Sequence, residues 1–414
     1  MTAIWQPAHQ VVILVGGKGT RLGALAKDSP KPLMRIDEST VFLDDVIFNL
    51  ARQGFSDVLL LAGHLAEKII DRYDGKSICG ARIKVLKEPE PAGTAGALLN
   101  AADALQESFL LANGDTLFDV NVRHLDKVLW ENPEVTGVMA LRRVEDSSRY
   151  GTVEIEDGYL KGFHEKHASA TGEGLINAGI GLFRKSILSY ISKNPSSIEL
   201  DVYPQLVVGR HLMGHEFSGY FIDIGLPETL EEAQATIPSK RARPALFLDR
   251  DGVINEDNGY THRADDLRFI DCAVDIIRHA NDMGALVVVV TNQAGVAHGY
   301  YELGDVEAFH RAMNDELHKN AAFIDSFYLC PFHPAASKPA YLHPDHPDRK
   351  PNPGMLLRAL QDWPIVRERS ILIGDKESDI VAAQRAGIRG IKFNGGSLSS
   401  LAHTVFQHLG GQGI

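Results

Sequence analysis

The sequence predicts two α/β domains in tandem, because two short apolar strands each lead into a polar loop. The first strand covers residues 11–15 and the second covers residues 245–248, and both runs are wholly apolar, as strands buried on two faces are. A length of 414 residues allows two or three domains that each bury a core. Residues 238–244 are polar, basic and bounded by prolines, so we predict a linker there. The expected domains are residues 1–237 and residues 245–414.

The composition indicates a globular protein that acts on small molecules. The apolar fraction is 44% and the charged fraction is 23%, which are values of an ordinary folded protein. The net charge of −12 argues against a nucleic-acid partner, since phosphate backbones require clustered lysine and arginine. Cys79, Cys272 and Cys330 are too scattered for a disulfide framework, and no apolar run approaches the roughly 20 residues of a membrane span. We therefore expect a cytoplasmic location and no membrane partner.

A glycine-rich segment follows the first strand and is a candidate phosphate-binding loop. It reads Gly-Gly-Lys-Gly-Thr-Arg over residues 16–21, and Ser-Pro-Lys-Pro follows at residues 29–32. Glycines directly after a strand let backbone N–H groups approach a polyphosphate, with a positive side chain directed at it. A plain tight turn would explain the glycines alone, but the second lysine in a rigid, proline-flanked segment favours nucleotide binding.

These two segments, with others in the same order, resemble those of the sugar-phosphate nucleotidyltransferases. The resemblance covers about residues 11–235 and implies a Rossmann-like, GT-A-like mixed α/β sheet. Any one segment has an ordinary structural explanation, such as a solvated charge or a helix cap, so the ordered set is what favours the family. The further matching segments are Glu88–Ala97, Leu110–Asp115, Tyr150–Val153, Glu165–Lys166, Ile176–Gly179 and Tyr220–Gly225.

The resemblance implies a site for each participant in nucleotidyl transfer. Attack of a sugar 1-phosphate oxygen on an α-phosphate brings several negative charges together, so oxygen ligands must hold Mg²⁺ and cations must neutralise the developing charge. Positioning and electrostatics then dominate the catalysis. By similarity, the expected residues are Asp115 and Asp223 for Mg²⁺, Arg21 and Lys31 as catalytic contacts of the triphosphate, Gly16, Gly17, Gly19, Thr20, Glu88, Gly93 and Thr94 for the nucleotide, and Gly151, Glu165, Lys166 and Asn177 for the sugar phosphate.

Glu88 leads to a hypothesis about the base of the nucleotide. If Glu88 meets the base edge, its carboxylate can accept hydrogen bonds from both N1–H and N2–H of guanine, whereas adenine offers no such pair of donors. We therefore expect GTP, although a surface position before Pro89 would equally explain Glu88. Around residues 150–153, 176–180 and 221–227 the sequence most resembles D-glycero-D-manno-heptose 1-phosphate guanylyltransferases, and mannose 1-phosphate enzymes share much of this pattern.

The second half opens with Asp249-Arg-Asp251-Gly directly after its first strand, and this matches the DxDG signature of haloacid-dehalogenase-type (HAD) phosphatases. One carboxylate must attack phosphorus, and a second one two residues on must protonate the leaving oxygen and then activate water. A turn or a metal-binding loop would explain a lone Asp-x-Asp. Three further segments occur in the family's order, at residues 287–293, 349–351 and 371–379. The resemblance implies a HAD-type parallel Rossmannoid sheet.

The match extends beyond the superfamily, because the same segments resemble D-glycero-D-manno-heptose 1,7-bisphosphate 7-phosphatases. This resemblance implies that Asp249 is the nucleophile and that Asp251 is the general acid and base. The other implied residues are Asp249, Asp251 and Asp375 for Mg²⁺, Thr291, Asn292 and Lys350 for stabilising the phosphoryl group, and Asp257, Asn258, Gly259, Tyr260, Arg349 and Lys376 for contacts with the sugar phosphate.

Two departures from the phosphatase family are visible. The family often has Ser-Gly-Ile-Ala-Arg-Gly after its Thr-Asn-Gln, whereas this sequence has Ala-Gly-Val-Ala-His-Gly, so that His298 replaces an arginine. Many members also carry a structural zinc site of three cysteines and a histidine, of which only Cys330 is kept in place here. Cys330, His333, His343 and His346 could rebuild a site, but zinc strongly prefers well-ordered tetrahedral sets. We therefore expect a zinc-free loop with surface histidines.

The two resemblances together predict a bifunctional enzyme of nucleotide-activated heptose biosynthesis. The 7-phosphatase would produce the heptose 1-phosphate that the transferase half uses, giving GDP-heptose and pyrophosphate. One alternative is a mannose 1-phosphate-type guanylyltransferase fused to a phosphatase of other specificity, such as one acting on histidinol phosphate. Another is a regulator that binds nucleotide sugar without turnover, but this would predict loss of the catalytic carboxylates, which are retained. Self-association of related nucleotidyltransferases is the one basis for expecting a homo-oligomer.

Overall fold

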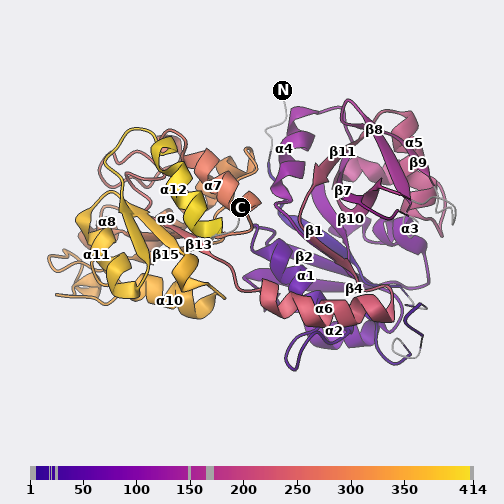
Figure 1. The fold of residues 1–414 in the computed structure, drawn as a ribbon, viewed down its shortest axis with the longest axis horizontal. Helices are drawn as coiled ribbons and strands as arrows, with labels where there is room; N and C mark the ends of the chain where they lie inside the picture. The colour runs from indigo at the N-terminus through magenta and orange to yellow at the C-terminus, as the bar shows by residue number, and fades with distance from the viewer. Residues whose placement is uncertain are drawn as a thin grey trace. The chain divides into compact units, whose positions relative to one another are not determined.

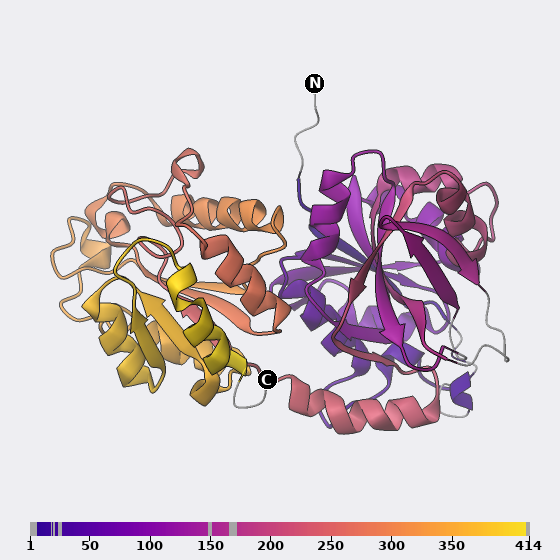
Figure 2. The ribbon, with the colours of Figure 1, turned by 45° about the horizontal axis from the view of Figure 1, so that its top comes forward.

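The computed structural model describes residues 6–17, 19, 21–23, 27–147, 151–164 and 172–410. The chain divides into two compact units, Met1–Pro238 and Ser239–Ile414. Each unit is a β-sheet covered by helices on both faces (Figure 1 and, turned by 45°, Figure 2). None of the described helices is long and apolar enough to cross a membrane.

The main sheet of the first unit is mixed. Its strands are β1 (Gln10–Leu14), β2 (Asp57–Ala62), β3 (Ser77–Ile78), β4 (Ala81–Lys87), β5 (Ser108–Asn113), β7 (Gly137–Val144), β8 (Thr152–Glu156), β9 (Tyr159–His164), β10 (Gly174–Arg184) and β11 (Leu212–Phe217). Within the described part of the chain they form one ten-stranded sheet in the order β3-β4-β2-β1-β5-β10-β7-β11-β9-β8. β1, β2, β4 and β5 are parallel, whereas β10 runs antiparallel to β5 and β7. The loops that follow the parallel strands therefore meet at one edge.

A separate pair of short strands crosses this edge. β6 (Thr116–Asp119) and β12 (Tyr220–Asp223) run antiparallel, and their register places Asp223 opposite Thr116. Ile224 N also donates a hydrogen bond to Asp115 O at 3.0 Å. This pairing brings Asp115 and Asp223 side by side although they are far apart in the sequence.

Helices cover both faces of the large sheet, which explains why its central strands are apolar throughout. The helices are α1 (Phe42–Ala51), α2 (Ala66–Tyr73), α3 (Gly93–Asn100), α4 (Arg123–Glu131), α5 (Tyr203–Val208) and α6 (Pro227–Lys240). Val11 and Ile13 of β1 pack in the core beneath α1, α2, α4 and α6. Val12 packs in the opposite core, beneath α3 and α5. Successive side chains of one strand thus fill two different cores.

The predicted linker at residues 238–244 is largely structured. α6 continues through Pro238 to Lys240, because a proline so close to the end of a helix removes a single backbone donor and disturbs only the last turn. Arg243 N donates to Pro364 O at 2.9 Å, and Val366 N donates to Arg243 O at 2.8 Å, so this segment is already part of the second unit. Regular structure therefore continues to Lys240 and resumes at Arg243 within the segment predicted as a linker.

The second unit contains a parallel sheet. Its strands are β13 (Ala245–Leu248), β14 (Leu286–Asn292), β15 (Ser326–Cys330), β16 (Ile371–Gly374) and β17 (Arg389–Lys392). In the described residues they form a five-stranded sheet in the order β15-β14-β13-β16-β17, and every pairing is parallel. β13 coincides with the strand that the sequence predicts at residues 245–248.

The helices of the second unit also lie in two layers (Figure 1). They are α7 (Ala273–Asp282), α8 (Ala294–His298), α9 (Leu303–His318), α10 (Gly354–Asp362), α11 (Glu377–Ala386) and α12 (Ser399–Gly410). Leu246 and Leu248 of β13 pack in a core with α7, α9 and α12, and Phe247 packs in a core with α10 and α11.

The register of the central strands decides where the polar loops lie. Leu248 is opposite both Val289 of β14 and Ile373 of β16. The next residues along these strands, among them Asp249, Thr291 and Asp375, therefore emerge at one edge of the sheet. Ligands of open parallel sheets bind at this carboxyl edge.

Candidate active sites

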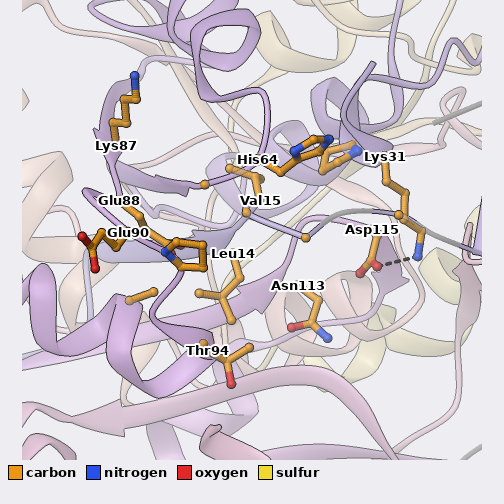
Figure 3. A pocket seen from close by; sticks show the side chains of 18 of the residues that line it. Leu14, Val15, Lys31, His64, Lys87, Glu88, Glu90, Thr94, Asn113 and Asp115 are labelled. Atoms are coloured by element: carbon orange, nitrogen blue, oxygen red, sulfur yellow. Dashed lines mark hydrogen bonds and ion pairs between the residues drawn. The ribbon is translucent and has the colours of Figure 1, made fainter. Parts of the chain in front are cut away.

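A cavity of about 760 Å³ lies in the first unit at the carboxyl ends of β1, β2, β4 and β5 (Figure 3). Most of the nucleotide and catalytic residues expected from the sequence line it. They are Gly16, Gly17, Gly19, Arg21, Lys31, Glu88, Gly93, Thr94 and Asp115. Thr20 lies outside the described residues. Figure 3 shows Lys31 and Asp115 towards one end of the cavity and Glu88 and Glu90 towards the other.

Glu88, which follows β4, lies against two glycines, Gly16 after β1 and Gly63 after β2. A Cβ atom on Gly16 would come within 2.8 Å of Glu88 Oε1, and one on Gly63 would lie 3.5 Å from Glu88 Cδ. The absence of side chains at both positions therefore makes room for the carboxylate. Ala92 N donates a long hydrogen bond of 3.4 Å to Glu88 Oε2. Glu88 is thus a wall of the cavity, and the alternative of a surface glutamate does not describe its position.

A lysine joins two carboxylates at the other end of the cavity. Lys31 Nζ lies 2.5 Å from Asp115 Oδ2 and 3.5 Å from Asp223 Oδ1. The pKa of Asp223 is raised, first because the group is buried and then because Asp115 carries a like charge, while Lys31 acts in the opposite direction. Two facing carboxylates and a lysine are a suitable set for holding a divalent cation beside a phosphate.

The Thr94 hydroxyl is hydrogen-bonded within the protein, so it is less available to a nucleotide than the sequence suggests. Its hydroxyl donates to Glu199 Oε2 at 3.0 Å and accepts from Ile198 N at 2.8 Å. Thr94 therefore fixes the segment that carries Glu199, which also lines the cavity. The other lining residues absent from the sequence prediction include Gly63, His64 and Asn113, which belong to or follow the ends of β2 and β5. Their position at parallel strand ends is the signal that could have found them.

Of the residues expected to bind the sugar phosphate, Gly151 and Asn177 lie side by side, because the antiparallel pairing of β8 with β10 places Thr152 opposite Ile176. Glu165 and Lys166 lie outside the described residues. Gly151 and Asn177 are described, and neither is among the residues that line the cavity. Asn177 Oδ1 accepts a hydrogen bond of 3.0 Å from Gly179 N, within a break in the register between β10 and β7. The sugar-phosphate contacts remain a prediction.

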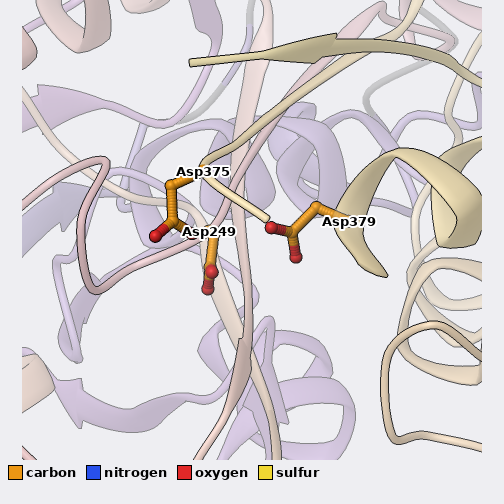
Figure 4. Close-up of side chains that lie close together, drawn as sticks. All are labelled: Asp249, Asp375 and Asp379. Carbon is orange, nitrogen blue, oxygen red and sulfur yellow. The ribbon is translucent and has the colours of Figure 1, made fainter. Parts of the chain in front are cut away.

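Three aspartates converge at the carboxyl edge of the second sheet (Figure 4). Asp249, Asp375 and Asp379 each place a carboxylate oxygen within 4.8 Å of the others. Asp249 follows β13 and Asp375 follows β16, whereas Asp379 lies in the first turn of α11. Asp379 is not among the site residues expected from the sequence. The sequence signal that could have identified Asp379 is its position four residues after Asp375, across the turn from β16 to α11.

Lys350 is buried among these carboxylates. Its Nζ atom lies 2.8 Å from Asp249 Oδ1 and 2.7 Å from Asp379 Oδ1, and it donates to Val290 O at 2.8 Å. Burial alone would lower the pKa of Lys350, but the two negative charges outweigh it and raise this pKa. Burial raises the pKa of Asp249 to about 6; Lys350 opposes this rise, and Asp379 adds to it. A fully charged lysine is therefore fixed beside the candidate nucleophile.

The side chain of Asp251 lies outside the group of three aspartates, and the metal role expected for this residue stays a prediction. Arg250 binds both of its oxygens, with Nε 3.1 Å from Oδ1 and Nη2 2.8 Å from Oδ2. Asn255 Nδ2 and Gln293 Nε2 each donate a further hydrogen bond of 3.1 Å. The Asp251 side chain is thus held in one orientation, with both of its oxygens accepting hydrogen bonds.

Arg250 is itself completely buried and closely held. Its Nη2 atom donates to Thr261 O at 2.6 Å, and Nη1 lies 3.3 Å from His310 Nε2. The guanidinium also stacks over Phe309 at 4.7 Å. Burial, and then the charge of Arg250, lower the pKa of His310 to about 3, so that a neutral imidazole accepts from the arginine.

Asn292 also holds the backbone of Lys350, beside the phosphoryl role expected for it. Its amide donates to Lys350 O and accepts from Lys350 N, both at 3.1 Å, so both ends of the side chain bind the lysine backbone. Asn292 therefore positions Lys350, and the second proton of its amide nitrogen is left to donate to a phosphoryl oxygen. Thr291 is buried, and its hydroxyl accepts a hydrogen bond of 2.8 Å from Gln293 Nε2, which leaves its own proton to donate.

The turn after Asp251 depends on a glycine. Gly252 has a φ of +85°, a conformation that residues with a Cβ atom rarely adopt. A Cβ atom there would also come within 2.7 Å of Asp375 Oδ2. The glycine of the DxDG signature thus allows the two strand ends to approach each other.

The loop at residues 257–260 faces the strand end that carries Lys376. Lys376 Nζ lies 3.8 Å from Asp257 Oδ2 and 3.7 Å from Asp375 Oδ2, and the side chain is largely exposed. Asp257 and Asn258 shape the turn, because Gly259 N donates to Asp257 Oδ1 at 3.0 Å and Asn258 N donates to Thr261 Oγ1 at 3.2 Å. These residues surround the carboxyl edge, in line with the predicted substrate contacts, which stay a prediction.

The histidines near Cys330 do not converge as a tetrahedral metal site does. Cys330 Sγ lies 3.9 Å from His346 Nδ1, but the His346 ring stacks on Phe332 with centroids 3.9 Å apart. His346 Nδ1 also accepts from Asp348 N at 3.1 Å, so it is already occupied. Among the described residues, the one group of at least three potential metal ligands within 4.8 Å of one another is that of the three aspartates.

Residues 10–240 match the family described as nucleotidyl transferase, which is more than half of the chain. The chain belongs to the nucleotidyl transferase family. Residues 348–405 match a second family, described as HAD-hydrolase-like. The first unit is thus a nucleotidyl transferase unit, and the combination of families that the motifs predict is confirmed.

Relatives of known name match each unit of this nucleotidyl transferase separately. A D-glycero-alpha-D-manno-heptose 1-phosphate guanylyltransferase of Aneurinibacillus thermoaerophilus is 34% identical over 228 residues, covering 54% of this chain and 96% of the relative. A D-glycero-beta-D-manno-heptose-1,7-bisphosphate 7-phosphatase of Rhodopseudomonas palustris is 45% identical over 154 residues, covering 37% of this chain and 84% of the relative. The solved structure of a UTP-bound UGPase from Acinetobacter baumannii shares the fold, with a TM-score of 0.50, 16% identity, and coverage of 56% of this chain and 93% of that one.

Proposed function

We propose that this chain carries out two consecutive steps of nucleotide-activated heptose synthesis. Its second unit removes the 7-phosphate of D-glycero-D-manno-heptose 1,7-bisphosphate. Its first unit then transfers GMP from GTP to the resulting heptose 1-phosphate and releases pyrophosphate, giving GDP-heptose. The observation that carries the proposal is that the two units are similar, separately, to a heptose 1-phosphate guanylyltransferase and a heptose bisphosphate 7-phosphatase.

The donor sets of both units fit Mg²⁺. Asp375 Oδ1 is buried and has no hydrogen-bond partner among the described residues, and it belongs to the group of three converging aspartates. In the first unit, burial and the facing charge of Asp115 raise the pKa of Asp223, a penalty that a cation would relieve. We assign Asp249 and Asp375, with Asp379 beside them, to one ion and Asp115 and Asp223 to another. Bound Mg²⁺ would neutralise phosphate charge at each site.

In the phosphatase unit, Asp249 attacks the phosphorus of the 7-phosphate, and Asp251 gives a proton to the departing sugar oxygen. A bond then joins the Asp249 carboxylate to phosphorus, and the sugar leaves as an alcohol. Asp251 next takes a proton from water, whose oxygen attacks the same phosphorus and releases inorganic phosphate. Lys350 and the Thr291 hydroxyl stabilise the equatorial oxygens, because the lysine lies 2.8 Å from the nucleophile.

In the transferase unit, a phosphate oxygen of the heptose 1-phosphate attacks the α-phosphorus of GTP, and pyrophosphate leaves. The glycines at residues 16, 17 and 19 let backbone N–H groups approach the triphosphate, and Arg21 and Lys31 neutralise its charge. Gly151, Glu165, Lys166 and Asn177 are proposed to bind the sugar phosphate by their resemblance to the family. Glu88, held against Gly16 and Gly63, is proposed to accept hydrogen bonds from guanine.

The anomeric configuration links the two steps. The phosphatase relative is named for the beta anomer and the guanylyltransferase relative for the alpha anomer. The first unit can use the product of the second only if the phosphatase accepts the alpha anomer, because hydrolysis at position 7 leaves position 1 unchanged. We therefore propose that the alpha bisphosphate is the substrate of the coupled reaction.

The test is one reaction followed by ³¹P NMR, with the purified full chain, Mg²⁺, GTP and either anomer of the heptose bisphosphate. We expect inorganic phosphate first, and then pyrophosphate and a GDP-sugar with the alpha anomer. Phosphate release without GDP-sugar from either anomer would contradict the proposed transferase. Absence of phosphate release from both anomers would contradict the proposed phosphatase.

A further inference from the structure

A buried glutamine joins two residues of the proposed phosphatase mechanism. Gln293 directly follows β14, and its side chain is buried. Its Nε2 atom donates one hydrogen bond of 3.1 Å to Asp251 Oδ2 and another of 2.8 Å to Thr291 Oγ1. Asp251 is the proposed acid at the leaving oxygen, and Thr291 is a proposed donor to an equatorial oxygen. One amide nitrogen therefore connects the groups that meet two different oxygens of the same phosphoryl group.

Two donors hold the other end of this amide. The Tyr301 hydroxyl donates to Gln293 Oε1 at 2.8 Å, and Arg250 Nη2 lies 3.3 Å from the same oxygen. Both protons and both lone pairs of the amide thus have partners. A flipped amide would direct its oxygen at the Asp251 carboxylate and its N–H groups at the Arg250 guanidinium, which is unfavourable at both ends. The surroundings therefore determine which end of the amide faces Asp251.

Packing holds the Tyr301 ring in place. The ring fills the space of a side chain at residue 295, because a Cβ atom on Gly295 would come within 2.3 Å of Tyr301 Cζ. The His262 ring stacks on it, with centroids 4.4 Å apart and planes inclined by 21°. Burial raises the pKa of Tyr301 to about 12; Arg250 opposes this rise, and Asp251 adds to it. The hydroxyl therefore keeps its proton near neutral pH and remains a donor.

This chain of contacts links the loop after β13 to the end of β14. Arg250 belongs to the same loop as Asp251, whereas Gln293 lies two residues after Thr291 on the neighbouring strand end. A general acid acts only within hydrogen-bond reach of its target, and a displacement of about 1 Å can cost a large factor in rate. A shift of the Gln293 amide would displace both the acid and the phosphoryl donor.

We propose that Gln293 is a positioning residue for phosphoryl transfer and that Tyr301 acts through it, by holding the amide with Nε2 directed at Asp251 and Thr291. The inference rests on the proposed phosphatase function and adds how proton transfer to the leaving oxygen is aligned. The amide takes part in no bond change. The bond from Asp249 to phosphorus forms, the bond from phosphorus to the sugar oxygen breaks, and the proton of Asp251 passes to that oxygen.

The test compares two substrates that differ in their need for this proton. The sugar oxygen of heptose 1,7-bisphosphate is a poor leaving group unless Asp251 protonates it, whereas p-nitrophenolate is stable enough to leave without a proton. The ratio kcat/KM reports the steps up to departure of the leaving group. It therefore isolates the role of Asp251 as an acid from its later role as a base towards water.

Two variants of the full chain and their combination are measured. Gln293→Met keeps the length of the side chain and removes both donors, so kcat/KM for the bisphosphate should fall by about 10- to 100-fold through kcat, and that for p-nitrophenyl phosphate by less than about 5-fold. Tyr301→Phe keeps the ring and should lower kcat/KM for the bisphosphate by about 3- to 10-fold. In the Gln293→Met background, Tyr301→Phe should have no further effect, because it acts through the amide.

Tyr328→Phe is the matched control. Its hydroxyl also donates a hydrogen bond of 2.8 Å to a side chain, Asp362 Oδ2, but Tyr328 lies on β15 and contacts none of these residues. We expect this substitution to change the hydrolysis of neither substrate. Thermal unfolding of each variant shows whether it folds, and if Gln293→Met does not, the comparison of the two substrates in Tyr301→Phe decides.

Equal losses with both substrates, no loss with either, or additive losses in the double variant would contradict the positioning role. In each of these cases, phosphate release from the bisphosphate by the wild type still supports the proposed function. A wild-type chain that releases no phosphate from the bisphosphate contradicts the proposed function, and the inference falls with it.

Discussion

Both units place a lysine between two aspartates at the carboxyl edge of a sheet, but they bury it to very different degrees. In the first unit the side chains of Lys31, Asp115 and Asp223 are 12%, 31% and 34% exposed. In the second unit those of Lys350, Asp249 and Asp379 are 3%, 9% and 1% exposed. The first arrangement opens into a cavity of about 760 Å³ that suits a whole nucleotide.

The difference in burial suits the different role proposed for each lysine. A partly solvated lysine can move from a carboxylate to a phosphate at little cost, which suits the binding of a large triphosphate. A buried lysine is held in place by the carboxylates that it pairs with. An unpaired charge costs much free energy in a medium of low dielectric constant. The second site is therefore organised before the substrate arrives, and only a phosphoryl group has to enter it.

The largest expected effect tests whether the two sites are independent. Asp249→Asn removes the nucleophile and should lower phosphate release by at least about 1,000-fold, while GDP-sugar formation from supplied heptose 1-phosphate stays unchanged. Asp115→Ala should do the reverse. Phosphate and pyrophosphate release are measured separately in each variant. Loss of both activities in either variant would contradict two independent sites.

The second prediction concerns the free energy of unfolding. Lys350→Met leaves Asp249 and Asp379 buried without a cation, and we expect a loss of about 3–5 kcal/mol. Lys31→Met is the matched variant in the more open site, and we expect a change below about 1 kcal/mol. Urea unfolding followed by circular dichroism measures both. Equal losses in the two variants would remove the distinction between the sites.

The third prediction concerns which nucleotide base the cavity of the first unit prefers. Glu88→Gln replaces one of the two carboxylate acceptors by a donor, so the preference for GTP over ATP should fall by about 10- to 100-fold. The preference is measured as the ratio of kcat/KM values for pyrophosphate release. Glu90→Gln, at another position of the cavity wall, is the control and should leave the ratio unchanged. A wild-type enzyme that prefers UTP or CTP would contradict the assignment of Glu88.

The last prediction is a pH dependence of stability in the buried network. The pKa of His310 is lowered to about 3 by burial and by Arg250, whereas an unfolded histidine titrates near 6.5. Between these values the unfolded chain binds a proton that the folded chain does not, so stability falls as the pH falls, by about 1.4 kcal/mol per unit. His310→Gln should reduce this slope. The exposed His403→Gln is the control, and an equal slope in all three proteins between pH 6 and pH 4 would contradict the prediction.

The sequence predicts the residues at strand ends better than those held by tertiary contacts. Asp249 and Thr291 belong to short apolar strands whose periodicity is plain, and Asp115 follows a strand of the same kind. Asp379 lies one helical turn beyond the strand end, and its approach to Lys350 depends on the packing of α11. Strand patterns alone do not carry this information.

The contacts of two predicted site residues show the same limit. Asn292 has the chemistry of a phosphate ligand, yet both ends of its amide are used by the backbone of Lys350, which is 58 residues away. Asp251 has the chemistry of a metal ligand, yet its neighbour Arg250 folds back and binds both of its oxygens. Residue type indicates which chemistry is available, and only long-range contacts decide which is used.

The pairing of β6 with β12 determines when the candidate site of the first unit can form while the chain is being synthesised. Asp115 precedes β6, whereas Asp223 ends β12, the last strand of its unit. A ribosome must therefore release almost the whole unit before the two carboxylates can meet, since domains fold as their own chain emerges. A nascent chain that stops before β12 has the glycine loop and Lys31 but lacks half of the acidic pair. If the acidic pair acts as proposed, nucleotidyl transfer begins only after the fold of that unit is complete.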